Sequence, residues 1–253
     1  MDLVKIIKSL PYASIRILGK AVLSSSPTLG RKLAAEFFGD FIFVFVGAGS
    51  AVATQYLGVN NPGSGLLIAA LANGIGLGVA ISATMAVSGG VLNPAVAVGL
   101  SVGGKLPARE VIPYIVAEVL GAAFAVGLLV AVAPAAIGKA VHWGSPTLAT
   151  SITSLQGMLF ELVMTFFLVF MVYGTAVDGR APKIAGFGIG LIVLTDVLVG
   201  GPFTGAAMNP ARAMGPMIAG LFFPGYWWIY WVGPVIGGIL AGLAYHYIME
   251  EKN

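Results

Sequence analysis

Long apolar segments separated by short polar breaks form the main pattern of this chain. The breaks carry Gly, Pro, Asn and charged residues, as in YLGVNNPGSG at 56–65 and DGRAPK at 178–183. Because a helix needs about 20 apolar residues to cross a bilayer, each long segment predicts a membrane-spanning helix. The expected spans are residues 33–55, 65–87, 111–132, 157–177, 184–200 and 227–248.

Two further apolar stretches contain the same tripeptide, in SGGVLNPAVAVGLSVGG and TGAAMNPARAMGPMIAG. Asn is a favoured N-cap, Pro is favoured at the first helical position, and Ala is the best helix former. The sequence therefore predicts one helix starting at Asn93-Pro94-Ala95 and a second at Asn209-Pro210-Ala211. The segments that follow are too short to cross a bilayer, so we expect two re-entrant half-helices. An ordinary turn is the alternative interpretation of each tripeptide, and two copies at matching positions argue against it.

An internal repeat relates the two halves. EFFGDFIFVFVGAGSAV at 36–52 aligns with ELVMTFFLVFMVYGTAV at 161–177, with Glu36 opposite Glu161. The Asn-Pro-Ala segments follow in the same order, and Tyr114 then matches Tyr230. Three spans per repeat is an odd number, so the second repeat must enter the membrane from the opposite side. The sequence therefore predicts an all-α membrane protein with six transmembrane helices and two re-entrant half-helices in an inverted repeat.

The composition supports a membrane protein and excludes several classes. Of the 253 residues, 58% are hydrophobic and only 9% are charged, whereas soluble domains carry about 25% charged residues. Cys is absent and the two His are far apart, so we expect no disulfide, no metal site and no cofactor. No nucleophile and base pattern indicates an enzyme, and no feature of the charge pattern indicates nucleic-acid binding.

The Lys and Arg residues orient the chain. With a cytoplasmic N-terminus, most of them lie on the inner side, Lys139 lies outside, and Arg212 lies within an apolar segment. An excess of Lys and Arg in cytoplasmic loops is typical of membrane proteins, so both termini are expected in the cytoplasm. The inner set is Lys5, Lys8, Arg16, Lys20, Arg31, Lys32, Lys105, Arg109, Arg180, Lys183 and Lys252.

The two half-helices predict a function. Inverted symmetry brings their N-termini together near the middle of the membrane, where irregular backbone is tolerated only if it is buried in protein or lines a water-filled path. Two positive dipole ends and two Asn amides would hold a neutral acceptor such as water and repel cations, including protons. A passive pore through the bilayer is therefore the main hypothesis.

These motifs resemble the aquaporin, or major intrinsic protein, family. SGGVLNPAV, TGAAMNPAR, the Glu36 and Glu161 pair, and WVGPVIGG at 231–238 carry the resemblance, which favours the tonoplast-intrinsic and related microbial branches. It implies a homotetramer in which each protomer has its own pore. It also divides the chain into a basic cytoplasmic segment, an aquaporin-like channel domain and a short cytoplasmic tail. Their bounds are 1–32, 33–249 and 250–253, with repeats at about 33–132 and 157–249.

The resemblance implies a selectivity filter at four positions, Asn73, Val197, Ala206 and Arg212. An Arg in an apolar segment is costly unless it faces a polar cavity, and a structural pair with Asp196 is the alternative. This filter lacks the bulky residues of strict water channels, so we expect water and also a small neutral solute such as ammonia, urea or hydrogen peroxide. Glycerol ranks lower, because Ala213 stands where glycerol channels have Asp.

The acidic residues inside the spans have several interpretations. Glu36 and Glu161 are expected to accept backbone N–H bonds from the re-entrant loops, and a proton relay is a weaker alternative. Asp40 and Glu118 are left open between a helix-interface role and a role in oligomer contacts.

Other function classes remain as rivals. A secondary transporter also uses inverted repeats and broken helices, and a structural membrane protein is a second alternative. The plasma membrane is the expected location, with an internal membrane as the alternative.

Overall fold

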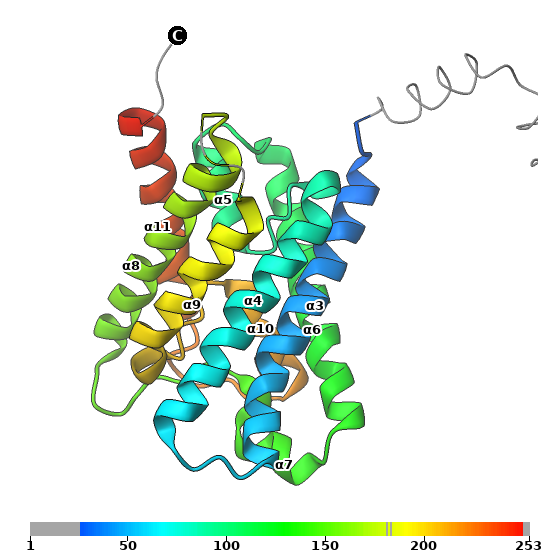
Figure 1. Cartoon of the computed structure of the whole chain (residues 1–253), viewed down its shortest axis with the longest axis vertical. Coiled ribbons are helices and arrows are strands. Elements are labelled where there is room, and N and C mark those ends of the chain that lie inside the picture. Colours follow the sequence, from blue (N-terminus) through cyan, green and yellow to red (C-terminus); the bar gives the residue numbers. More distant parts are fainter. Residues whose placement is uncertain (1–25, 181, 183, 250–253) are drawn as a thin grey trace, which may run out of the picture.

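The computed structural model describes residues 26–180, 182 and 184–249, and within these every regular element is a helix (Figure 1). Six helices are long and apolar enough to cross a membrane, as predicted. The segment 1–25 and the tail 250–253 lie outside the described residues. The six spans are α3 (Leu29–Tyr56), α4 (Pro62–Ser88), α6 (Ala108–Val132), α8 (Ser154–Val172) with its π-helical extension η2 (Tyr173–Val177), α9 (Ala185–Thr204), and α11 (Ile229–Ala244) with its extension η3 (Tyr245–Met249).

Capping residues set several of the helix starts. The side chain of Thr28 accepts the backbone N–H of Arg31, and Asn61 does the same for Ser64. Thr153 forms a reciprocal capping box with Gln156. The first span therefore begins at Leu29 rather than at the predicted residue 33, because hydropathy alone does not register a cap that precedes charged residues.

The two half-helices are α5 (Pro94–Val102) and α10 (Pro210–Ala219). At 1.5 Å per residue each is about 15 Å long, roughly half the thickness of the hydrocarbon core. The loop between α6 and α8 carries two short helices, α7 (Ala135–Ala140) and η1 (His142–Gly144). The predicted fold class, six spans with two re-entrant half-helices, is confirmed.

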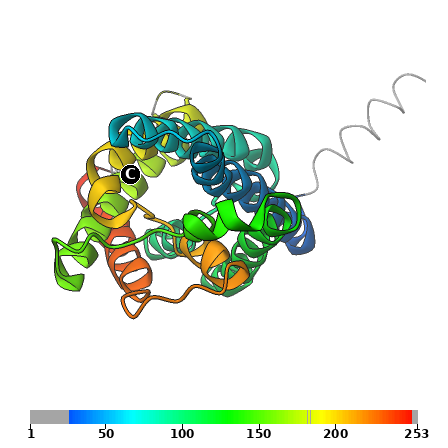
Figure 2. The same cartoon turned by 90° about the horizontal axis from the view of Figure 1, so that it is seen from below.

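The packing follows the inverted repeat. In each repeat the first and third spans pack together, α3 with α6 and α8 with α11, and the second spans α4 and α9 join the two repeats. Each half-helix packs against the third span of the other repeat, α5 against α11 and α10 against α6. Seen along the helix axes, the spans form a ring around the half-helices (Figure 2).

Glycine allows the closest of these contacts. A Cβ atom added to Gly74 on α4 would lie 2.6 Å from the carbonyl oxygen of Gly190 on α9, and one added to Gly190 would lie 2.5 Å from the carbonyl oxygen of Gly74. The two backbones therefore touch directly at this crossing. Small residues at helix interfaces are the usual means of close packing in membranes.

Candidate functional site: two re-entrant loops at the centre of the helix ring

The backbone of both loops adopts the same unusual path. After α4, Gly89 has φ 96° and Leu92 has φ 48°; after α9, Gly205 has φ 77° and Met208 has φ 52°. Left-handed backbone at a non-glycine residue costs about 1–3 kcal/mol and persists only where the surroundings hold it. Each loop must therefore be fixed by strong local contacts.

Two buried carboxylates supply those contacts. Glu36 on α3 accepts the N–H of Val91 at 3.1 Å and of Leu92 at 2.6 Å. Glu161 on α8 accepts the N–H of Ala207 at 2.9 Å and of Met208 at 2.6 Å. A carboxylate can satisfy two successive N–H groups at once, which is what an irregular turn inside a membrane requires.

The two Asn residues cap their half-helices and also link the two repeats. Oδ1 of Asn93 accepts the N–H of Ala95 at 2.9 Å, and Oδ1 of Asn209 accepts that of Ala211 at 2.9 Å. Nδ2 of Asn93 donates to the carbonyl of Met208 at 2.9 Å, and Nδ2 of Asn209 donates to the carbonyl of Leu92 at 2.7 Å. The N-termini of α5 and α10 thus meet through reciprocal bonds. Each Nδ2 has a second N–H that these bonds do not use.

Two tyrosines hold the carbonyls that precede the loops. The hydroxyl of Tyr114 donates to the carbonyl of Ser88 at 2.9 Å, and that of Tyr230 donates to the carbonyl of Thr204 at 2.8 Å. The internal repeat aligns the two tyrosines but does not predict this role for them. Their matching positions in the repeat were the available signal.

The structure brings two of the four expected filter residues into contact. Arg212 is buried on α10, with Nε 3.4 Å from Oδ1 of Asn73. Its Nη1 donates to the carbonyl of Gly144 at 3.1 Å. Both hydrogen bonds of the Arg212 side chain go to neutral oxygens, an amide and a backbone carbonyl. They do not form the alternative ion pair with Asp196. Gly144 was missed, because a backbone carbonyl from a distant loop leaves no sequence signal.

The other two expected filter residues are on α9 and in the second loop. Val197 is 4% exposed on the inner side of α9, whereas Val199 on the same helix is 63% exposed. Ala206 lies in the loop between α9 and α10, and a Cβ atom added to Gly200 would be 3.5 Å from its Cβ. Both side chains are small and apolar.

A cavity of about 340 Å³ lies beside the first loop and extends along α5. Its lining includes the backbone of Gly89 and Gly90, the side chains of Val91 and Val96, and Lys105. The volume is that of several water molecules, at about 30 Å³ for each. The lining reaches Val91, two residues before Asn93.

Comparisons with known proteins agree with this geometry. The chain matches the major intrinsic protein family over residues 23–245. It is 43% identical to the probable aquaporin TIP3-2 of Arabidopsis thaliana, over 91% of this chain and 88% of that protein. It is 45% identical to aquaporin TIP2-1 of Zea mays, over 88% of each. The solved structure of the aquaglyceroporin from Plasmodium falciparum, 23% identical, has the same fold, with a TM-score of 0.80 over 88% of this chain and 97% of that one. The chain therefore belongs to the major intrinsic protein family.

Proposed function

We propose that this protein is a passive membrane channel that conducts water and excludes ions and protons. The observation that carries the proposal is the meeting of two half-helix N-termini through Asn93 and Asn209. A water oxygen at this point accepts from the free N–H of each Asn, so its own hydrogens point away along the pore. Such a water donates in both directions and cannot pass a proton through, and the two positive helix ends repel cations.

The filter supports passage of a small neutral solute as well. Arg212 supplies fixed donors and a positive charge, and Asn73 lies beside it. Val197 and Ala206 leave more room than aromatic side chains would. We propose that urea, ammonia or hydrogen peroxide passes with water, and that glycerol passes less well. The relatives named as aquaporins support a channel function.

Assembly and location extend this proposal. We propose a homotetramer, as the family resemblance implies, with both termini in the cytoplasm, as the distribution of Lys and Arg predicts. Apolar side chains such as Ile112 and Phe187 cover the outer surface of the helix ring, as contact with lipid or a neighbouring protomer requires. The expected plasma membrane is not supported, since the relatives reported above are plant aquaporins of the TIP type. No observation favours a secondary transporter.

Stopped-flow light scattering on proteoliposomes tests the pore directly. Val197→Phe places a ring at the buried inner face of α9 and is expected to lower water permeability several-fold, with a larger effect on urea. Val199→Phe adds the same ring on the exposed side of the same helix and is the matched control. Equal permeability of the two variants, or wild-type vesicles no faster than empty ones, would contradict the proposal.

A further inference from the structure

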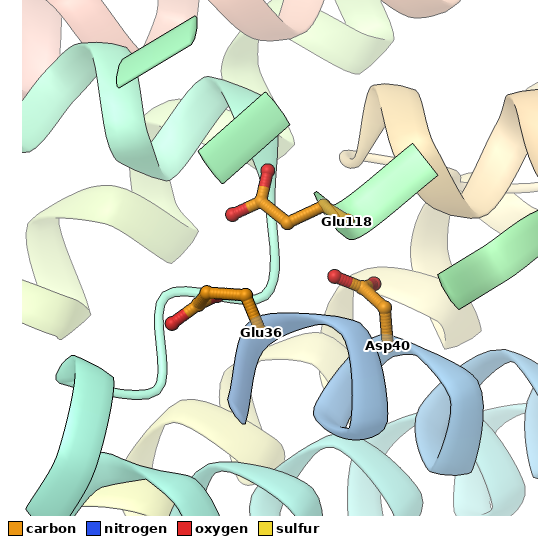
Figure 3. Close-up of side chains that lie close together, drawn as sticks. All are labelled: Glu36, Asp40 and Glu118. Carbon is orange, nitrogen blue, oxygen red and sulfur yellow. The ribbon is translucent and has the colours of Figure 1, made fainter. Parts of the chain in front are cut away.

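Three carboxyl groups converge beside the first loop (Figure 3). Glu36 and Asp40 extend from α3 and Glu118 from α6, all are 0% exposed, and one oxygen from each lies within 4.8 Å of the others. In the second repeat the positions opposite Asp40 and Glu118 are Thr165 and Pro234, so only the first repeat has this cluster.

The donors around the cluster leave several of its carboxyl oxygens without a hydrogen bond. The oxygens of Glu36 accept the N–H groups of Val91 and Leu92, and Oε1 of Glu118 accepts the N–H of Asn93 at 3.1 Å. Oε2 of Glu118 and both carboxyl oxygens of Asp40 receive no donor from the described residues. An oxygen of Glu118 nevertheless lies within 4.8 Å of an oxygen of Glu36, so the two carboxyl groups face each other without a donor between them among the described residues. A bond between two carboxyls requires a proton on one of them.

The charges around the cluster also require that some of its carboxyl groups are protonated. On the same helices, Arg31 and Arg109 are exposed, and Lys32 on α3 pairs with Glu110 on α6 at 2.8 Å. Closer to the cluster, Tyr114 on α6 donates to Ser88, and Arg212 on α10 contacts Asn73 and Gly144. None of these groups has an ion pair with the cluster in the described part of the chain. Three adjacent, fully buried carboxylates without a paired cation would be very costly, and such groups are neutralised instead.

We propose that the cluster holds two protons, one on Oε2 of Glu118 and one on Asp40, and that Glu36 alone is ionised. Glu118 is then a neutral positioning residue. Its Oε1 accepts the N–H of Asn93 while its Oε2–H donates to Glu36, so it ties Asn93 to the carboxylate that holds the first loop. The first loop then faces a single negative charge, as the second loop does at Glu161.

A bound divalent cation is the rival explanation, and the geometry favours protons. Ca²⁺ takes six to eight oxygen ligands, and Mg²⁺ keeps several waters. The cluster offers three oxygens without a donor, all buried away from solvent.

Infrared spectroscopy of the purified full-length protein at neutral pH tests the proposal through the carbonyl stretch of protonated carboxyls. We expect a protonated-carboxyl band in the wild type that Glu118→Gln and Asp40→Asn each reduce and that the double variant reduces further. Asp196, whose Oδ2 is also buried without a partner among the described residues, accounts for any band that remains. Glu110→Gln is the control, because Glu110, two turns earlier on α6, is paired with Lys32 at 2.8 Å and contributes no such band.

Water permeability gives the second readout. Gln at 118 keeps an acceptor for Asn93 and a donor for Glu36, so Glu118→Gln should retain the permeability that Glu118→Leu lowers several-fold. Absence of the band in the wild type, or a band unchanged in the double variant, would overturn the proposal whether or not the variants conduct. One equivalent of tightly bound divalent metal in the wild type, lost in Glu118→Gln, would replace it with the cation site.

Discussion

At the scale of single residues, the two loops are held by paired groups that occupy equivalent positions in the repeats. Glu36 and Glu161 satisfy the loop N–H groups, and Tyr114 and Tyr230 satisfy the carbonyls just before them. Backbone groups at membrane depth have no water to bond with, so each must find a partner within the protein. The loops therefore depend on side chains far away in the sequence.

Tyr230→Phe tests this dependence. The variant removes one hydroxyl and leaves the buried carbonyl of Thr204 without its 2.8 Å donor. An unsatisfied buried acceptor costs about 1–3 kcal/mol, so the thermal unfolding midpoint in detergent should fall. Tyr56→Phe, at a position 68% exposed on α3, should leave the midpoint unchanged. Equal shifts in the two variants would mean that the Tyr230 bond does not support the loop.

The sequence indicated the residues whose chemistry is unusual for their surroundings. Asn before Pro, acids in apolar helices and Arg212 all contrast with their neighbours, and the structure gathers them around the two loops. The backbone carbonyls of Ser88, Thr204 and Gly144 are common to every residue type. Their roles depend on the φ and ψ angles of the backbone, which cannot be derived from the residue types alone.

At the scale of helices, the contacts depend on which faces lack side chains. Hydropathy predicted the six spans, but their ends shifted where caps such as Thr28 and Thr153 start a helix. Hydropathy also gave no helix partners. The crossing of α4 and α9 is fixed by Gly74 and Gly190, where the two backbones touch.

Gly190→Ala tests the α4–α9 crossing. Its new Cβ would lie 2.5 Å from the carbonyl oxygen of Gly74, so the helices must separate. Overpacking of this kind costs about 1–3 kcal/mol, and the unfolding midpoint should fall. Gly127→Ala on α6 is the control, because a Cβ there meets nothing within 4 Å. A Gly190→Ala protein as stable as the control would show that the α4–α9 contact can accommodate the added methyl group.

At the scale of the whole molecule, the proposed orientation in the bilayer rests on the positions of the charged residues. Arg109 lies at the start of α6 and Lys139 lies beyond its end, so the 25-residue span between them separates the two by the thickness of the membrane. The proposed orientation, which follows the positive-inside rule, puts Arg109 in the cytoplasm and Lys139 outside.

Cysteine labelling tests the orientation without background, because the chain has no Cys of its own. In intact cells or sealed organelles, an impermeant thiol reagent should distinguish Lys139→Cys from Arg109→Cys, one reacting before and the other only after the membrane is opened. If the protein lies in the plasma membrane of intact cells, Lys139→Cys should react first. The reverse order would invert the proposed topology.

Each half-helix packs on a span of the other repeat, and this arrangement affects the order in which contacts form during synthesis. Asn93 finds its partner carbonyl at Met208, and α5 packs on α11, which is the last span to be synthesised. The carbonyl of Leu92 therefore gains its donor, Nδ2 of Asn209, only after more than a hundred further residues have been translated. Contacts between distant parts of a chain slow folding, since loop closure precedes any gain. A chain that stops after the third span would lack both the donor of Leu92 and the span on which α5 packs.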